Sequence, residues 1–346
     1  MPAGGGPLVG DVGELGLLDA IRPYLATSGG VAGGVLTIGA GDDAAAWEPP
    51  SDRAIVTTTD SLVEEVHFHR PTDPGVAGDV GWKLLAVSFS DLAAMAALPG
   101  PAFISLALPP EWPLAWVDAM YREMARLCQE HGAVIAGGNI TSAAAAVLTS
   151  TCLGVAEPSR ILRRDGARPG WALAVTGRLG GAAAALRLAH DPDAVPRLGA
   201  AGEEAQAAWR ARLRRPEPRL SAGAALTAAG IRVALDVSDG LYVDAGRLLG
   251  AGGAGGLLLD AAALPVEVGV REAWPGAWLD VVGGGEDYEL LFAGPPEMVD
   301  RACRALGGQG LEAVRIGTFD EGLGERVLVD GEERPAPAVG HLHFGG

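Results

Sequence analysis

Apolar segments along this 346-residue chain repeatedly lead into a carboxylate that stands beside glycine or a hydroxyl side chain. Aspartate is a poor strand former, and a carboxylate is costly to bury without a partner. Each acidic turn must therefore lie at a surface or against a cation, and one turn alone leaves both readings open. Five acidic turns occur, at Asp42–Asp43, Asp60, Asp91, Asp236 with Asp239, and Glu286–Asp287.

Strand-like and helical patterns alternate between these turns in both halves of the chain. Hairpin-like turns occur as well as helical crossovers, which predicts an α+β (mixed α/β) fold rather than one doubly wound sheet. Helices are expected over 13–25, 80–97, 114–132 and 296–307, and after the turns in 171–189 and 231–253. Strands are expected within 35–47, 53–68, 102–109, 133–142, 146–157, 171–189, 231–253, 256–265, 283–294, 314–319 and 325–331.

Charge, proline and glycine concentrate in SRILRRDGARPG at 159–170, which favours a domain boundary there. The chain length also suits about two domains. We expect an N-terminal domain over 1–157 and a C-terminal α/β domain over 158–346. Residues 191–219 are polar and arginine-rich, and we expect them to form a helical surface insert. The sequence indicates no function for this insert.

The charge balance excludes several classes of protein. The net charge is −17, so the basic footprint of a nucleic-acid-binding protein is missing. The basic residues are 25 arginines and one lysine, Lys83 in GWKLLA. Because a P-loop needs a lysine after its glycine-rich turn, that phosphate-binding motif is excluded. An acidic protein still binds phosphates where metal ions mediate the contact.

The cysteines and the N-terminus favour a cytoplasmic protein. Cys128, Cys152 and Cys303 lie far apart and form no metal-ligand spacing, so neither a disulfide framework nor a zinc site is expected. The opening MPAGGGPLVGDVGE has no positive start and no apolar core, unlike a signal peptide. Prolines and Asp91 interrupt the most apolar stretch, 88–110, so no membrane span is expected.

The acidic turns taken together indicate a site for divalent cations. Mg²⁺ prefers oxygen ligands and takes few of them from the protein, the rest from water and phosphate. Acidic turns from separate strands are able to converge on several Mg²⁺ ions that bridge a polyphosphate. Asp and Gly are also ordinary turn residues, so a structural role for each single turn remains the alternative. The Gly-Gly of VTGRLGG at 175–181 fits a phosphate loop or helix packing equally well.

Five sequence motifs that occur in a fixed order indicate a protein family. The stretches IGAGDDAA, TTTDSLVEEVHF, LLAVSFSDLAAMAA, LDVSDGL and GGGEDYELLF occur in this order. Together they resemble the thiamine-monophosphate kinase family, of the superfamily that also contains aminoimidazole ribonucleotide synthetase and selenophosphate synthetase. The resemblance runs from Gly13 to about Phe344, and VHF with GGEDYEL points to the thiamine branch.

The resemblance implies a kinase with a phosphate group as acceptor. Such an enzyme phosphorylates thiamine monophosphate to thiamine diphosphate by in-line transfer from ATP, assisted by several Mg²⁺ ions. The resemblance also implies a homodimer, in which the mixed sheet of the N-terminal domain forms the interface and ATP lies between the domains. The N-terminal domain would bind metal and ATP.

Site residues follow from the resemblance position by position. The implied metal ligands are Asp43, Thr58, Thr59, Asp60, Asp91, Asp236 and Asp239, of which Asp60, Asp91 and Asp239 are the catalytic candidates. The implied nucleotide contacts are Gly138, Asn139, Arg164 and Ser238. The implied substrate contacts are His67, Glu286 and His341. Asp244 is expected either to lie on a helix face or to support the ligands from behind.

Three positions depart from the family pattern. Asn139 stands where the family has a metal-binding aspartate, which removes one negative charge. Ser88 replaces an asparagine, and His341 stands where an aromatic side chain stacks on the thiamine ring. Two alternatives stay open. One is another ATP-using synthetase of the superfamily, although the reactive N-terminal cysteine and lysine of a selenophosphate synthetase are missing before Lys83. The other is a non-catalytic paralogue that binds nucleotide or a thiamine phosphate.

Overall fold

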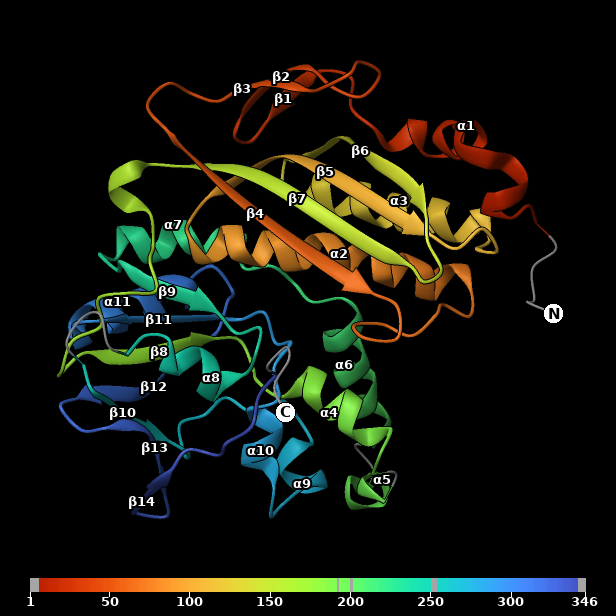
Figure 1. Ribbon diagram of the computed structural model, residues 1–346. Coiled ribbons are helices and arrows are strands. Elements are labelled where there is room, and N and C mark those ends of the chain that lie inside the picture. Colours follow the sequence, from red (N-terminus) through yellow and green to blue (C-terminus); the bar gives the residue numbers. More distant parts are fainter. Residues whose placement is uncertain (1–5, 192, 200–201, 250–253, 342–346) are drawn as a thin grey trace. The chain divides into compact units, whose positions relative to one another are not determined.

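The computed structural model describes residues 6–191, 193–199, 202–249 and 254–341. The chain divides into two compact units, and each is described by itself. Unit 1 comprises residues 1–92 and 97–159, and unit 2 comprises residues 93–96 and 160–346. Both units combine sheets and helices, so the predicted mixed α/β fold is confirmed (Figure 1).

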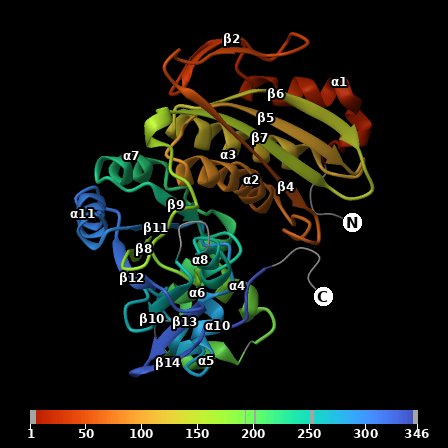
Figure 2. The ribbon, with the colours of Figure 1, turned by 60° about the vertical axis from the view of Figure 1, so that its left-hand side comes forward.

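Unit 1 is built on a four-stranded sheet of order β4-β7-β5-β6. Only the β5–β6 pair is parallel. Two long helices, α2 and α3, lie along one face of this sheet (Figure 1, Figure 2). A three-stranded sheet, β1-β2-β3, lies beyond the opposite face. The elements are α1 (Val9–Ile21), η1 (Arg22–Tyr24), β1 (Gly29–Val31), β2 (Gly34–Ile38), β3 (Ala46–Glu48), β4 (Ala54–Val63), α2 (Pro74–Ala94), β5 (Leu98–Leu108), α3 (Leu114–Glu130), β6 (Val134–Ser142), β7 (Val147–Ala156) and η2 (Pro158–Arg160).

Side-chain alternation gives the main sheet of unit 1 two different faces. Along β7, buried residues alternate with half-buried ones, as expected where one face packs on helices and the other does not. The buried face packs against Leu84, Leu85 and Phe89 of α2, which are each at most 1% exposed. The other face carries threonine and serine side chains from β4, β5 and β7.

The first helix differs from its predicted range, 13–25. It begins at Val9, contains a left-handed Gly13 at φ 64°, and ends at Ile21. Pro23 explains the end, because proline has no backbone N–H to continue the helical ladder, and the chain passes into the 3-10 turn η1.

Unit 2 is built on a seven-stranded sheet of order β14-β13-β10-β12-β8-β11-β9. All neighbouring strands are antiparallel except β10 and β13. The elements are β8 (Ala172–Thr176), α4 (Gly181–Leu188), α5 (Ala194–Arg197), α6 (Gly202–Arg214), α7 (Leu220–Ala228), β9 (Val233–Asp236), α8 (Leu241–Gly246), β10 (Gly256–Asp260), α9 (Val270–Ala273), α10 (Trp278–Val282), β11 (Leu290–Gly294), α11 (Pro296–Gly307), β12 (Ala313–Asp320), β13 (Gly324–Val329) and β14 (Glu332–Pro335).

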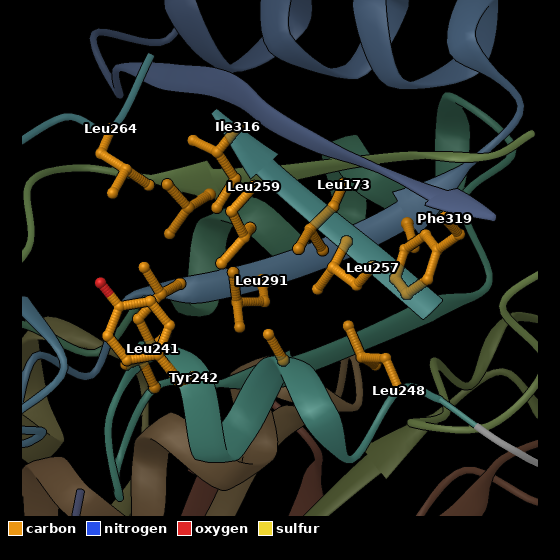
Figure 3. Close-up of a cluster of buried hydrophobic side chains, with 14 of the residues drawn as sticks. Leu173, Leu241, Tyr242, Leu248, Leu257, Leu259, Leu264, Leu291, Ile316 and Phe319 are labelled. Carbon is orange, nitrogen blue, oxygen red and sulfur yellow. The ribbon is translucent and has the colours of Figure 1, made fainter. Parts of the chain in front are cut away.

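Both faces of β8, β9 and β11 are buried, whereas the edge strand β14 is exposed. On one face, Leu173, Leu257 and Leu291 pack against Leu241 and Tyr242 of α8 (Figure 3). On the other face, alternate residues of the same strands pack against α7 and α11. A third cluster joins α4, α6 and α9 around the rings of Trp209 and Trp274, which are tilted by 31° with centroids 5.4 Å apart. Among the described residues, no helix combines the length and apolar character that a membrane crossing requires.

Candidate functional site

In unit 1, alternate residues of β4 meet α2 through hydrogen bonds. Thr58 Oγ1 donates to Asp91 Oδ2 on α2. Ser88, also on α2, donates from Oγ to Asp60 Oδ2 at 2.7 Å. Asp60 therefore lies inside a strand and Asp91 on a helix, whereas both were expected where an apolar segment leads into a turn. The two bonds bring three of the predicted metal ligands to one face of the sheet.

The Asp60 carboxylate suits a cation. Desolvation by burial raises the pKa of Asp60 above its ordinary value, and the hydrogen bond from Ser88 offsets part of that rise. Ser88 is itself wholly buried, and its Oγ lies 2.8 Å from Ser150 Oγ on β7. A carboxylate that is costly to ionise gains more from a bound cation than an exposed one, because the cation replaces the lost hydration.

Thr59 does not join this group. Its Oγ1 lies 3.1 Å from Thr151 Oγ1 on the opposite face of the sheet, since successive side chains of a strand alternate. That face carries a cavity of about 1090 Å³, which Asp43, Gly138 and Asn139 help to line. The structure thus separates the predicted ligands of unit 1 into two sets, one on each face. The other lining residues are Leu18, Arg22, Leu25, Thr27, Gly39, Ala40, Gly41, Asp42, Ala44, Ala45, Phe103, Ser105, Ala136, Gly137 and Thr151.

Gly138 also has a structural reason to be glycine. A Cβ at this position would lie 1.8 Å from the carbonyl oxygen of Ile104 on the neighbouring strand β5. Asn139 pairs with Ser105 in the same parallel ladder. Close strand pairing therefore accounts for this glycine whether or not a nucleotide approaches it.

His67 lies in the turn that follows β4. Its Nδ1 accepts the backbone N–H of Val63 at 3.1 Å, so the proton of the neutral ring lies on Nε2. Glu65 adopts a left-handed conformation at φ 63° and accepts hydrogen bonds from His69 Nδ1 and the Arg70 N–H, at 2.9 and 3.1 Å. These contacts fix the turn and give the His67 ring one orientation.

In unit 2, two motifs that are distant in sequence pack backbone to backbone. The N–H of Glu286 donates to the carbonyl of Ser238 at 2.9 Å. Gly240, at φ 120°, lies so close to the facing turn that a Cβ would be 2.0 Å from the carbonyl oxygen of Gly283. The N–H of His341 donates to the carbonyl of Asp239 at 2.9 Å. Four predicted site residues thus meet in one place.

Carboxylates converge on the same loop. Asp236 ends β9 and is buried, with 8% of its surface exposed. Asp244 on α8 is fully buried, and its Oδ2 accepts the N–H groups of Asp239 and Gly240 at 2.9 and 3.0 Å. Arg247 bridges Asp244 and Asp239. Asp244 therefore supports the loop from inside, as expected.

Arg164 lies beside β9 at the edge of the seven-stranded sheet. The adjacent Arg163 donates its N–H to the Arg232 carbonyl at 3.0 Å and accepts the N–H of Ala234 at 2.9 Å. Arg164 is exposed at this edge. The structure thus places it in the same unit as the Asp236–Asp239 loop and next to the strand that leads into it.

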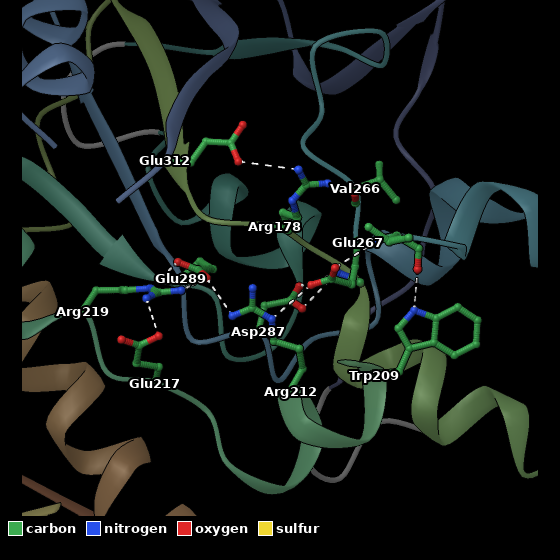
Figure 4. A network of polar contacts seen from close by, with 12 residues as sticks. Arg178, Trp209, Arg212, Glu217, Arg219, Val266, Glu267, Asp287, Glu289 and Glu312 are labelled. Atoms are coloured by element: carbon green, nitrogen blue, oxygen red, sulfur yellow. Dashed lines mark hydrogen bonds and ion pairs between the residues drawn. The ribbon is translucent and has the colours of Figure 1, made fainter. Parts of the chain in front are cut away.

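The GGGEDYELL turn is held by a buried polar network (Figure 4). Asp287 accepts the Gly180 N–H on both carboxylate oxygens, at 2.9 and 3.1 Å. Burial raises the pKa of the Asp287 carboxyl well above its ordinary value. Glu289 accepts hydrogen bonds from Thr176 and Arg219. The Gly180–Gly181 turn therefore binds an internal carboxylate. Gly180 has φ 86°, and a Cβ on Gly181 would lie 2.9 Å from Arg212, so both glycines have a structural reason without a phosphate.

No group of three or more His, Cys, Asp or Glu side chains has a metal-binding arrangement within the described part of the chain. The predicted ligands divide between the units, with Asp236 and Asp239 in unit 2 and the other five in unit 1. All seven offer carboxylate or hydroxyl oxygen, the ligand type that Mg²⁺ prefers. The residues fit an ion that takes one or two protein oxygens and completes its shell with phosphate and water.

Sequence reasoning missed three residues that contact the candidates. The sequence marks Ser88 only as a departure from the family pattern, and Ser150 and Arg247 do not stand out in it. The signal for Arg247 was its position three residues after Asp244 on an expected helix, where opposite charges meet. Ser150 gave no signal, because its contact with Ser88 joins residues 62 positions apart.

Comparison with known proteins identifies the family. Residues 41–156 match the model of the AIR synthase related protein, N-terminal domain. The curated thiamine-monophosphate kinase of Mycobacterium tuberculosis strain H37Rv is 33% identical over 342 residues, covering 94% of this chain and 90% of the relative. The crystal structure of thiamine-monophosphate kinase from Stenotrophomonas maltophilia K279a has a TM-score of 0.76 at 34% identity, and covers 93% of this chain and 96% of its own.

A second solved structure, "AaThiL complexed with AMPPCP and TMP", has a TM-score of 0.72 at 27% identity and covers 96% of this chain and 97% of its own. The relatives are matched over nearly their whole length, so the resemblance inferred from the ordered motifs is confirmed. The chain belongs to the thiamine-monophosphate kinase family of enzymes.

Proposed function

We propose that this chain transfers the γ-phosphoryl group of ATP to thiamine monophosphate, forming thiamine diphosphate and ADP. The observation that carries this proposal is the full-length similarity to a relative in complex with AMPPCP and TMP. The oxygen-rich residues of the two units support it, because a polyphosphate bound through divalent cations needs carboxylates rather than a lysine-bearing loop.

The chemistry needs little from a general base. The phosphate of thiamine monophosphate carries a negative charge near neutral pH, since the second pKa of such an ester is about 6. One of its oxygens forms a bond to the γ-phosphorus while the bond from that phosphorus to the ADP oxygen breaks. The protein therefore has to position two anions in line and offset their charge.

Seven residues are proposed to hold Mg²⁺ ions as separate sets: Thr58, Asp60 and Asp91 on one face of the unit 1 sheet, Asp43 and Thr59 on the other, and Asp236 and Asp239 in unit 2. When bound, Mg²⁺ supplies the positive charge that lets an acidic site accept two phosphate-bearing molecules. The protein's own contribution is to fix the oxygens: Ser88 orients Asp60, Thr58 orients Asp91, and Asp244 fixes the Asp239 loop. Asp60, Asp91 and Asp239 are the proposed catalytic residues.

The remaining candidates would bind the two substrates. Gly138, Asn139, Ser238 and Arg164 are proposed to contact the nucleotide, with Arg164 as the main protein cation. His67, Glu286 and His341 are proposed to contact thiamine monophosphate. The His67 ring is oriented by the Val63 N–H, so its Nε2–H is the donor for a phosphate oxygen.

We also propose a cytoplasmic homodimer in which residues 1–157 bind metal and ATP and form the interface, and residues 158–346 form a C-terminal α/β domain. The mixed four-stranded sheet of the N-terminal domain, β4-β7-β5-β6, is the proposed source of the interface. Size-exclusion chromatography with light scattering tests this directly.

The test is product formation. Purified protein is incubated with ATP, Mg²⁺ and thiamine monophosphate, and thiamine diphosphate is measured by mass spectrometry. Asp239→Asn and Asn139→Asp are assayed alongside. Product from the unaltered protein and none from Asp239→Asn is the expected result. More product from Asn139→Asp would show that the missing carboxylate weakens metal binding.

One observation favours a second candidate, a non-catalytic protein that binds nucleotide or thiamine phosphate. Asn139 has an uncharged side chain in the cavity that Asp43 also lines. On that account the unaltered protein forms no product but Asn139→Asp does. Magnesium-dependent turnover by the unaltered protein rejects it.

A further inference from the structure

Arg247 occupies an unusual position between two carboxylates of the candidate site. It caps the C-terminal end of α8. Its Nη1 lies 2.5 Å from Asp244 Oδ1, and its Nη2 contacts Asp239 Oδ2. The Asp244 side chain is fully buried, while those of Asp239 and Arg247 are 24% and 36% exposed. One arm of the guanidinium is therefore anchored inside, and the other reaches the more exposed carboxylate.

The anchored arm is held in a defined position. Asp244 uses one oxygen for Arg247 and the other for the N–H groups of Asp239 and Gly240. The same buried carboxylate thus positions the guanidinium and the loop that carries Asp239. If the Asp239 contact opens, Arg247 remains held by Asp244.

The outer contact conflicts with a metal ion on Asp239. In unit 2, Arg247 interacts with three carboxylates, those of Asp236, Asp239 and Asp244. A divalent cation on Asp239 would lie within a few ångströms of the guanidinium, and like charges at that distance repel. A metal ion on the contacted oxygen, Oδ2, therefore requires the outer arm to leave Asp239, and the partial exposure of Arg247 leaves that arm a route into solvent.

We propose that Arg247 is a positioning residue that serves as the resident counter-cation of Asp239. It holds the carboxylate and its loop in place before metal binds, and it yields Asp239 to the metal while staying on Asp244. Arg247 thereby lowers the affinity of this position for a divalent cation. This inference rests on the metal role of Asp239 in the proposed function.

The test uses Mn²⁺, whose free form is measured by electron paramagnetic resonance, with the full-length protein and saturating AMPPCP. Replacing Arg247 with glutamine should tighten the Asp239-dependent Mn²⁺ affinity about two- to fivefold, the scale of one partly exposed ion pair. The gain should vanish in the Asp239→Asn background. A purely structural role for Arg247 predicts no tighter binding.

Arg326 supplies the matched control. It also bridges two carboxylates in unit 2, those of Asp320 and Glu333, and its side chain is 26% exposed. Arg326→Gln should leave Mn²⁺ affinity unchanged. Thermal midpoints measured with EDTA show whether both variants are folded, and Arg247→Lys, which keeps the charge, should restore most of the original Mn²⁺ affinity.

The outcomes separate the two claims. Weaker Mn²⁺ binding in Asp239→Asn with no tightening in Arg247→Gln overturns the role of Arg247 and leaves the proposed metal site standing. Weaker AMPPCP or Mn²⁺ binding in Arg247→Gln overturns it as well, since Arg247 would then contact the phosphates. If Asp239→Asn leaves Mn²⁺ binding unchanged, the metal role of Asp239 fails and this inference fails with it.

Discussion

The buried ion pair between Arg219 and Glu289 gives a quantitative prediction about the turn that carries Glu286. The side chains are 10% and 1% exposed, and Arg219 Nη2 lies 2.5 Å from Glu289 Oε1. Within the part of the chain that the structure describes, Arg219→Met would leave the buried Glu289 carboxylate with Thr176 and the more distant Arg212, whose Nη1 is 3.5 Å away. Removing one partner of a buried pair costs about 3–5 kcal/mol.

Arg212 and Thr176 still contact the Glu289 carboxylate in this variant. We therefore expect the free energy of unfolding to fall by about 3 kcal/mol, the lower end of that range. For a unit of this size that lowers the thermal midpoint by roughly 6–12 °C. Differential scanning calorimetry of the full chain measures it. Arg219→Met with Glu289→Gln removes both charges and should recover most of the loss, since a neutralised pair leaves no bare buried charge.

An exposed pair in the same unit is the control. Arg334 and Glu332 lie 2.9 Å apart with side chains 56% and 74% exposed. Arg334→Met should change stability by less than about 0.5 kcal/mol. An Arg219→Met protein as stable as Arg334→Met, or a double variant no more stable than Arg219→Met, would refute the reasoning.

Three further predictions concern the site and its supports. Ser88→Ala removes the buried hydrogen-bond donor to Asp60. It should lower the free energy of unfolding, measured by calorimetry, by about 1.5–3 kcal/mol and should weaken Mn²⁺ binding. Ser88→Thr keeps the hydroxyl and should retain the stability and the Mn²⁺ affinity. Burial raises the pKa of Asp287, so its contribution to stability is full below the ordinary carboxyl pKa and is lost as the pH rises through the raised value. Asp287→Asn should therefore flatten the fall in thermal midpoint as the pH rises above the ordinary carboxyl pKa of about 4. Gly240→Ala places a Cβ 2.0 Å from a carbonyl oxygen at φ 120° and should lower the midpoint and the activity, whereas Gly276→Ala, with open space around it, should change neither.

The longer elements of the fold could be predicted from local pattern. Alternation along 146–157 and helical spacing along 114–132 match β7 and α3 closely, because each buries one continuous face. The strands β1, β3 and β14 were missed because they span only three or four residues. Helix α7 was missed because LSAGAALTA is apolar on every side and shows no period.

The candidate site could be predicted in its residue types but not in its contacts. The alternation of β4 could have separated Thr59 from Thr58 and Asp60, since a strand has a period of two. The meeting of Ser238 with Glu286 could not be predicted, because it depends on the pairing of β9 with β11. The Arg219–Glu289 pair joins residues 70 positions apart and likewise depends on tertiary structure.

The measurement that tests the account most directly is the transfer of labelled γ-phosphate from ATP. Thiamine monophosphate, free thiamine and no acceptor are compared, each with Mg²⁺ and with EDTA. The account predicts labelled thiamine diphosphate from thiamine monophosphate with Mg²⁺, and none with EDTA or in Asp239→Asn. Label that appears only as inorganic phosphate, or product that forms equally well with EDTA, would contradict a metal-dependent kinase acting on thiamine monophosphate.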